Sequence, residues 1–283
     1  MTRTDALKGS RLFVTSLDRG LQVLTAFWEG GASMKLAELA QAANMSKSAT
    51  QRFAYTLVTL GYLRKNEITK EFSLAPRSLE VGLRYLQTSP LVNGSNPYLH
   101  SLNRACEETC CLAEPDGLDM VYVSRFPAHK EMFVNMPLGM RIPMFCTATG
   151  RAILSRLSLD IAMDMLERSN RVPYTTNTII DLARFKDLLE EADVNGYTWA
   201  DSEYYSGDIN IAAPILDPSG APVASVNIAA ASSRFTLAQA KAELGPQVIE
   251  TARAISGSGA VRQLQIMHEF RKKQTPSSEG HPT

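Results

Sequence analysis

Apolar residues recur at helical spacing near the start of the chain, and the segment SLDRGLQVLTAFWEGG therefore predicts a first helix. Ser16 is placed to cap this helix, and Gly30-Gly31 is placed to end it. The apolar face of the helix consists of Leu17, Leu21, Leu24 and Phe27 or Trp28. A second, short amphipathic helix follows, and its apolar positions are Leu36, Leu39 and Ala40.

A longer third helix is predicted after a turn at residues 44–46, with Ser46 as its cap and Gly61 as its end. Its buried side, at spacings i, i+4 and i+7, is predicted to carry Phe53, Leu57 and Leu60. The segment YLRKNEITKEFSLAP then predicts two short strands, over residues 62–65 and 71–74, around a polar turn. Three helices followed by a β-hairpin predict a winged helix-turn-helix.

The rest of the chain mixes helical and strand patterns, which predicts an α+β domain. A linker helix is predicted over residues 77–87, then a break over SPLVNGSNP, then a helix with Pro97 in its first turn. Further helices are predicted over residues 149–156, 159–168, 181–194 and 236–255. Strands are predicted over residues 109–113, 120–125, 209–216 and 222–230.

The composition is that of a globular protein, with 45% hydrophobic and 20% charged residues and a mean hydropathy of -0.12. No apolar run approaches the roughly 18 residues that a membrane helix needs. The first residues contain no apolar stretch followed by a small-residue cleavage site, so we expect a cytoplasmic protein with no membrane partner. The cysteines, which we expect to be reduced there, are Cys106, Cys110, Cys111 and Cys146.

The formal net charge is zero, but the charges are unevenly distributed. Residues 1–76 contain ten Lys or Arg and six Asp or Glu, so this segment carries +4. The remaining residues contain 19 basic and 23 acidic side chains and therefore carry -4. A basic N-terminal unit attached to an acidic one is what a nucleic-acid contact confined to the N-terminus would produce.

The second helix of a helix-turn-helix enters the major groove by its first turn, so the residues after its cap must be short, polar or basic. Gln51 and Arg52 are the best candidates for base contact, because an amide pairs with adenine and a guanidinium with guanine. The wing is expected to bind the DNA backbone. The predicted DNA-binding residues are Lys47, Ser48, Thr50, Gln51, Arg52, Arg64, Lys65 and Lys70.

A winged helix can also serve as a protein-interaction module, in which the polar residues of the third helix would simply face solvent. The basic excess of residues 1–76 and the polar stripe at the start of the helix favour binding of double-stranded DNA instead.

Several segments, in their order and spacing, resemble the IclR family of bacterial transcriptional regulators from about residue 16 to residue 256. They include LAELAQAANMSKSATQRFAYTLVTLGYL, IPMFCTATGRAIL and NGYTWADSEYYSGDINIAAPILDPSG. The resemblance implies a DNA-binding regulator without enzymatic activity, which acts as a homodimer or homotetramer on a palindromic or pseudo-palindromic operator. It also implies a GAF-like second domain, in which a six-stranded antiparallel sheet flanked by helices binds a small organic or aromatic acid.

The resemblance also implies where this effector pocket lies: at the Pro-x3-Thr-x2-Gly segment from Pro143 and around the Asp-x-Glu-x3-Gly motif from Asp201. The turn at residues 147–150 offers backbone amides at a helix start, where a carboxylate is favoured. Apolar residues beside isolated asparagines favour an aromatic acid, as in the branch of the family that controls aromatic catabolism. The predicted effector-binding residues are Met140, Ile142, Phe145, Thr147, Ala148, Thr149, Gly150, Asp201, Asn210 and Asn227.

At 283 residues the chain exceeds the usual size of one domain, and we expect two compact units. The first is a winged helix-turn-helix DNA-binding domain over residues 1–76, followed by a linker helix over residues 77–90. An effector-binding and oligomerisation domain is expected over residues 91–258, and an extension with a disordered tail over residues 259–283. We expect the effector to act on DNA binding through the linker helix.

An enzyme would need a constellation of catalytic residues, and the sequence contains no GxSxG, HExxH, P-loop or dinucleotide-binding motif. Asp201 and Glu203 are spaced to share a strand face as paired carboxylates do, but the favoured interpretation is that they orient a loop. We therefore expect no catalytic residue and no cofactor.

A zinc site is the other alternative, because His100, Cys106, Cys110 and Cys111 lie close together in the sequence. Adjacent residues of a strand point to opposite faces, so Cys110 and Cys111 cannot both enter one tetrahedral site. Buried cysteines are the favoured interpretation, and no metal is expected.

Overall fold

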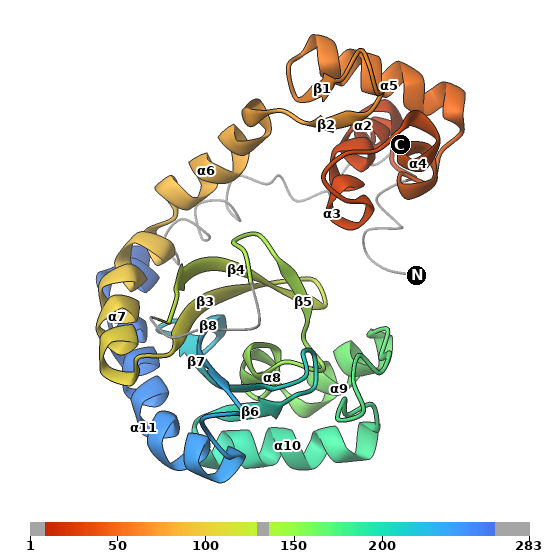
Figure 1. Ribbon diagram of the computed structural model, residues 1–283. Coiled ribbons are helices and arrows are strands. Elements are labelled where there is room, and N and C mark those ends of the chain that lie inside the picture. The colour runs from red at the N-terminus through yellow and green to blue at the C-terminus, as the bar shows by residue number, and fades with distance from the viewer. Residues whose placement is uncertain (1–8, 129–135, 264–283) are drawn as a thin grey trace, which may run out of the picture. The chain divides into compact units, whose positions relative to one another are not determined.

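The computed structural model describes residues 9–128 and 136–263 in two compact units, which divide between Tyr85 and Leu86 (Figure 1). The division falls inside the linker that the sequence predicts over residues 77–90. The end of the predicted disordered tail, residues 264–283, lies outside the described residues.

The first unit is a winged helix-turn-helix, as the sequence predicts. Its strands β1 and β2 pair antiparallel, with Leu63 opposite Leu74, and form the wing. Its elements are α2 (Thr15–Thr25), α3 (Phe27–Gly30), α4 (Leu36–Ala42), α5 (Lys47–Thr59), β1 (Leu63–Lys65), β2 (Phe72–Leu74), the 3-10 turn η1 (Pro76–Ser78) and α6 (Leu79–Thr88), which crosses the division between the units.

The predicted first helix is two helices, α2 and α3, and it starts earlier than predicted. The N-cap of α2 is Val14, which makes no side-chain cap bond, so Ser16 lies inside the helix and does not cap it. By contrast, Ser46 caps α5 as predicted, since its Oγ accepts a hydrogen bond from the Ala49 N–H at 3.3 Å. Gly61 follows α5 with φ of +79°, a conformation that glycine adopts without strain.

The core of the first unit is narrower than the apolar pattern predicts. Leu17 and Leu21 of α2 are 63% and 52% exposed, and Leu60 at the end of α5 is 49% exposed. The core is filled instead by residues of α2, α3, α4, α5 and both strands, which include Val23, Phe27, Leu39, Ala54, Leu57, Leu63 and Phe72. The exposed leucines are therefore available for contacts outside the unit.

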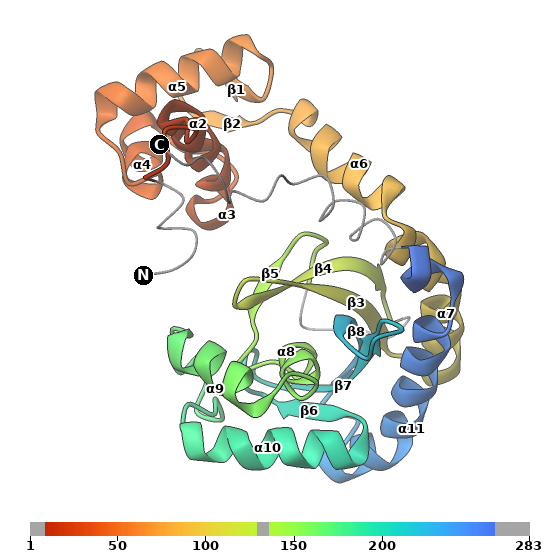
Figure 2. The same ribbon diagram turned by 180° about the vertical axis from the view of Figure 1, so that it is seen from behind.

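The second unit is built on a six-stranded antiparallel sheet with the strand order β5-β4-β3-β8-β7-β6 (Figure 2). Its strands are β3 (Thr109–Asp116), β4 (Asp119–Phe126), β5 (Arg141–Pro143), β6 (Thr198–Asp201), β7 (Asp208–Leu216) and β8 (Pro222–Ala231). Its helices are α7 (Pro90–Cys106), α8 (Ala148–Leu154), α9 (Leu159–Arg168), α10 (Leu182–Asn195) and α11 (Leu237–Ser256). The α+β class and the six strands that the family resemblance implies are thereby confirmed.

The two faces of this sheet are covered by different helices. α7 and α11 pack on one face, and α8 packs against β6, β7 and β8 on the other (Figures 1 and 2). Along β7 the residues alternate accordingly, because successive side chains of a strand point to opposite faces. Ile209, Ile211 and Ile215 enter the core under α7 and α11, whereas Asp208 and Asn210 point to the face that carries α8.

The prediction that Pro97 starts a helix, after a break over residues 89–97, is wrong. α7 begins at Pro90, where Ser89 Oγ accepts a hydrogen bond from the Val92 N–H, and it continues through Pro97 to Cys106. An internal proline removes one helical hydrogen bond. Burial of one face of α7 against the sheet offsets that loss, and this face includes Leu91, Val92, Leu99 and Leu102.

Candidate functional site

The first turn of α5 presents a polar surface to solvent. Lys47, Ser48, Gln51 and Arg52 are exposed, whereas Leu57 anchors the opposite side of the helix in the core. This is the arrangement that the sequence predicts for a recognition helix, with polar side chains outward and apolar ones inward.

Thr50 differs from the prediction that it contacts DNA. Its side chain is completely buried, and its hydroxyl donates a hydrogen bond to the Ser46 carbonyl at 3.0 Å. A threonine in a helix can satisfy its hydroxyl in this way, four residues back along the backbone. Thr50 therefore stabilises the start of α5, and its buried side chain is not exposed for contact with DNA.

A groove of about 960 Å³ runs along α5 and the wing within the first unit. Five of the predicted DNA-binding residues line it, while Lys47 and Arg64 are exposed outside it. Its lining also contains Tyr55, which is 73% exposed and which the sequence analysis did not single out. The lining residues are Leu36, Ser48, Gln51, Arg52, Tyr55, Thr56, Val58, Lys65, Glu67, Lys70 and Phe72.

The wing lysines already have an anionic partner. Glu67 lies between them, with its carboxylate 3.7 Å from Lys65 Nζ and 3.1 Å from Lys70 Nζ. Hydrogen bonding and charge from Lys70, together with the charge of Lys65, lower the pKa of Glu67. Exposed ion pairs of this kind contribute little stability, so a phosphate can replace Glu67 at small cost.

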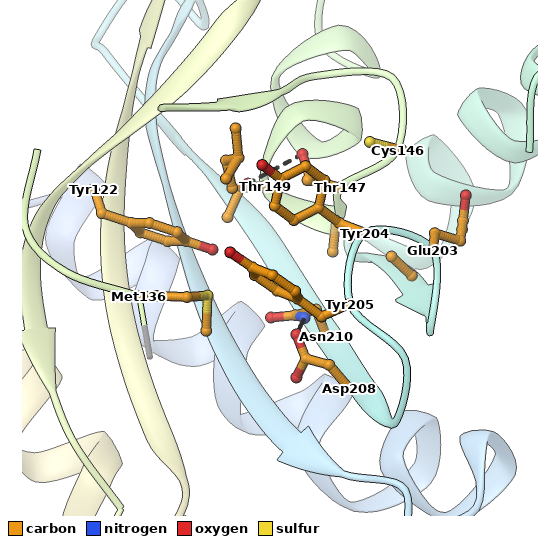
Figure 3. Close-up of a pocket in the computed structure, with 13 residues that line it drawn as sticks. Tyr122, Met136, Cys146, Thr147, Thr149, Glu203, Tyr204, Tyr205, Asp208 and Asn210 are labelled. Atoms are coloured by element: carbon orange, nitrogen blue, oxygen red, sulfur yellow. Dashed lines mark hydrogen bonds between the residues drawn. The ribbon is translucent and has the colours of Figure 1, made fainter. Parts of the chain in front are cut away.

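The second unit contains a small pocket between α8, the sheet and the turn after β6 (Figure 3). Its free volume is about 20 Å³, which has room for about one water molecule. The hydroxyl ends of Tyr122 and Tyr205 point toward each other across it in Figure 3. The lining residues are Tyr122, Met136, Ile142, Cys146, Thr147, Ala148, Thr149, Ala200, Glu203, Tyr204, Tyr205, Asp208 and Asn210.

Half of the predicted effector-binding residues line this pocket: Ile142, Thr147, Ala148, Thr149 and Asn210. The other half lie outside the lining: Met140, Phe145, Gly150, Asp201 and Asn227. The aromatic side of the pocket was missed. Tyr204 and Tyr205 lie inside the Asp-x-Glu-x3-Gly motif from Asp201, whereas no sequence motif connects them with Tyr122 of β4. Asp208 was missed too, although it stands two residues before Asn210 and shares its face of β7.

Gly150 has a structural role that explains why it is outside the lining. A Cβ atom at this position would lie 2.2 Å from the Cα of Met144, so only glycine fits. Its N–H, which the sequence analysis offers to a carboxylate, donates to Thr147 Oγ1 at 3.3 Å. The Thr147 hydroxyl in turn donates to the Pro143 carbonyl at 2.7 Å, and this bond holds the segment before α8 in place.

A buried ion pair forms the wall behind the pocket. Arg151 of α8 and Glu203 of the turn after β6 are 0% and 2% exposed, and two hydrogen bonds join the guanidinium to the carboxylate. Arg151 also donates to the carbonyls of Phe145 and Trp199, both at 3.1 Å. The alternative of paired carboxylates on one strand face does not hold, because β6 ends at Asp201 and Glu203 lies in the turn after it.

Asp208 ends a chain of side-chain hydrogen bonds in the sheet. Asn227 Nδ2 donates to Asn210 Oδ1 at 2.8 Å, and Asn210 Nδ2 donates to Asp208 Oδ2 at 2.6 Å. Asn227 thus supports the pocket from behind although it does not line it. Burial raises the pKa of Asp208 to about 6, and the hydrogen bond from Asn210 only partly opposes this shift.

Three weaker acids of the pocket lining stay protonated. Burial raises the pKa of Tyr204 to about 12 and that of Cys146 to about 12. Burial also raises the pKa of Tyr122 well above its ordinary value. These groups therefore act as neutral hydrogen-bonding groups, and none is a nucleophile or base at neutral pH.

The cysteines are all unpaired thiols, and adjacent ones point to opposite faces of β3 as predicted. Cys110 packs in the core under α7 and α11, whereas Cys111 packs on the side of α8. Cys106 Sγ lies 3.5 Å from Cys110 Sγ. Within residues 9–128 and 136–263, no three His, Cys, Asp or Glu side chains gather as metal ligands, and no helix is long and apolar enough to cross a membrane.

Two family models match this chain. The model of the bacterial transcriptional regulator IclR C-terminal domain matches residues 83–257, and that of the IclR helix-turn-helix domain matches residues 16–67. The Pca regulon regulatory protein of Pseudomonas putida is 29% identical over 252 residues, which cover 89% of this chain and 86% of the relative.

Solved structures share the whole fold. A transcriptional regulator from Rhodococcus sp. RHA1 is 32% identical and has a TM-score of 0.75, covering 89% of this chain and 100% of that structure. An IclR homologue from Microbacterium hydrocarbonoxydans, complexed with 4-hydroxybenzoate, is 19% identical and has a TM-score of 0.70, covering 88% of this chain and 99% of that one.

A winged helix-turn-helix joined to a domain that encloses a small pocket defines a DNA-binding regulator with an effector domain. The chain belongs to the IclR family of bacterial transcriptional regulators. Members of this family are regulators and not enzymes.

The two classes of DNA contact can be separated by substitution. Arg52→Ala, at the exposed tip of α5, is expected to weaken binding to a specific duplex by about tenfold or more and to relax sequence preference. Lys65→Ala, in the wing, is expected to weaken binding to all duplexes about equally. It should also reduce the slope of log affinity against log salt concentration by about one. Fluorescence anisotropy with specific and random duplexes at two salt concentrations measures both. Arg104→Ala, an exposed change in the second unit, is the control, and equal behaviour of the first two variants would refute the assignment.

The buried carboxyl group of Asp208 should make stability depend on pH. Because its folded pKa of about 6 lies above the ordinary 3.8, the folded state holds this proton more tightly, and stability falls as pH rises from about 4 to 6. Asp208→Asn should therefore be neutral near pH 4 and stabilise by up to about 3 kcal/mol above pH 7. Urea unfolding at several pH values measures this gain, with exposed Asp160→Asn as control. A gain that is the same at every pH contradicts the assignment.

Proposed function

We propose that this chain is a homodimeric regulator whose binding to a palindromic or pseudo-palindromic operator is changed by a small aromatic acid. The observation that carries the proposal is the pocket of the second unit, which three tyrosines and two threonines line. Aromatic rings supply the apolar contacts of a ligand ring, and the hydroxyl groups fix its orientation. Because the partner is the chromosome of a bacterium, we place the protein in the cytoplasm.

The relatives support an aromatic effector. The Microbacterium homologue, which shares the fold, was crystallised with 4-hydroxybenzoate, and the Pseudomonas relative is named as the regulator of the Pca regulon. On this basis we propose a role in the control of aromatic catabolism for the present chain as well.

Exposed apolar residues support a homodimer. Leu17, Leu21 and Trp28 are each more than half exposed in the first unit, and α6 carries a second group, Leu79, Val81, Leu83 and Tyr85. Several large apolar side chains exposed to solvent on helices are typical of an interface with another chain. A second copy of the chain would bring a second recognition helix, and two recognition helices bind a palindromic site.

The linker is attached firmly to the recognition helix, which supports the route by which an effector would act. Arg77 Nη1 donates to the Leu60 carbonyl at the end of α5 at 2.8 Å, and Ser78 Oγ donates to the Tyr62 carbonyl at 2.9 Å. The Arg77 guanidinium also lies 5.4 Å from the centre of the Tyr62 ring. A movement of α6 would therefore be passed to α5 through direct bonds.

The dimer can be tested in solution. Leu17→Glu combined with Leu21→Glu should convert the protein to monomers and weaken operator binding by about a hundredfold, because each monomer then holds one half-site only. Sedimentation equilibrium measures the mass, and Val194→Glu on α10, at another highly exposed apolar position, is the matched control. A double variant that keeps the mass of the parent protein would exclude this face of α2 as the interface.

The regulatory role can be tested by its reciprocity. If 4-hydroxybenzoate changes operator affinity by some factor, the operator must change 4-hydroxybenzoate affinity by the same factor. Gel shifts with duplexes from the chain's own promoter region, with and without the acid, give the first factor, and calorimetry with and without duplex gives the second. Binding of both partners without mutual effect would show that this acid is not the regulator's effector.

A further inference from the structure

Asp208 places a buried carboxylate on the wall of the effector pocket. It is the first residue of β7, its side chain is 8% exposed, and it lies on the same face of the sheet as Asn210 (Figure 3). A carboxylate that has lost most of its hydration needs hydrogen-bond donors or a cation in its place.

Among the described residues, one such donor reaches the carboxylate. Asn210 Nδ2 donates to Asp208 Oδ2, and the other carboxylate oxygen has no hydrogen-bond partner among the described residues. Tyr205 lines the same pocket as Asp208, but its hydroxyl donates to the sulfur of Met140 at 3.9 Å. The chain from Asn227 through Asn210 therefore ends at Asp208 with an unused acceptor on the pocket wall.

The charge of Asp208 is not balanced by the pocket lining either. The described lining residues include no Lys, Arg or His, and the nearby Arg151 is fully engaged by Glu203. The other titratable groups that face Asp208 are neutral acids: Cys111 of β3, Tyr122 of β4 and Tyr205. A second anion at this place would meet an unscreened negative charge.

Building on the proposed function, we propose that Asp208 selects effectors that present a hydrogen-bond donor, a ring hydroxyl or amino group, at this end of the pocket. An aromatic acid that fits must then carry its single carboxylate elsewhere, and an aromatic dicarboxylate is rejected. Hydroxylated or aminated benzoates satisfy this requirement, whereas benzoate leaves the acceptor without a partner. A buried acceptor that loses its donor discriminates strongly between such ligands, since a hydrogen bond to a charged group is among the strongest.

The test compares ligands that differ at one position of the ring. Calorimetry of the full chain with 3-hydroxybenzoate, 4-hydroxybenzoate, 4-aminobenzoate, benzoate and terephthalate should show at least one donor-bearing acid binding about tenfold or more tighter than benzoate. Terephthalate should bind more weakly than benzoate.

Substitution of Asp208 assigns the effect to its carboxylate. In Asp208→Ala the donor-bearing acid and benzoate should bind within about twofold of each other, while Asp208→Asn should bind terephthalate about tenfold more tightly than the parent protein. Asp160→Asn, an exposed carboxylate of α9 outside the lining, is the control and should keep the original preference. If Asp208→Ala does not fold, Asp208→Asn decides alone, because rejection of terephthalate that persists in this variant overturns the proposal.

The outcomes separate this inference from the function on which it rests. Binding of the acids without preference for a donor, or a preference that survives in Asp208→Ala, overturns the role of Asp208 and leaves the aromatic effector intact. Failure of every probe to bind the parent protein overturns the aromatic effector, and the role of Asp208 falls with it.

Discussion

The pocket of the second unit depends on the buried ion pair between Arg151 and Glu203. An unpaired charge in such a place would cost about 3–5 kcal/mol, so the two side chains hold each other in place. The pair joins segments far apart in the sequence, because Glu203 also accepts from the Ile179 N–H at 3.2 Å and its carbonyl accepts from the Thr178 hydroxyl at 2.6 Å. α8, the turn after β6 and the segment before α10 are thereby fixed around one point, and the pocket lies beside it.

The pair also decides the electrostatics of the pocket. Arg151 is a fully buried cation close to the lining, but the Glu203 carboxylate neutralises its charge. Two backbone carbonyls accept further hydrogen bonds from its guanidinium. The described wall is therefore neutral apart from Asp208, and an effector meets polar hydroxyl groups and one acceptor instead of a cation. Recognition of an acid in such a pocket relies on hydrogen bonds and aromatic contacts more than on ion pairing.

Much of the fold could be predicted from the sequence, because amphipathic patterns, helix caps and terminal glycines are visible locally. Ser46 and Gly61, at the two ends of α5, are examples. It fails where burial overrides local preference: Pro97 continues a helix because one face of α7 is buried, and Thr50 turns inward because its hydroxyl can bond the backbone. Thr147 and Thr149 could be predicted from one motif, but Tyr122 meets Tyr204, Tyr205 and Asp208 only in the folded chain. No local pattern encodes a contact between β4 and the turn after β6.

The small free volume of the pocket sets a condition on any effector. Room for about one water molecule does not admit an aromatic ring, so binding must move side chains, and the tyrosines are the large groups in the way. Tyr204 and Tyr205 follow Glu203 directly, and their rings form a contact chain with Tyr174, with successive centres 4.7 Å apart. A ligand that displaces these rings therefore acts on the turn held by the ion pair. A ligand shifts an equilibrium between two conformations only by the difference in its affinity for them. The ring-filled pocket is the conformation without ligand, so the regulatory effect of an effector depends on how much more tightly it binds the conformation in which the rings have moved.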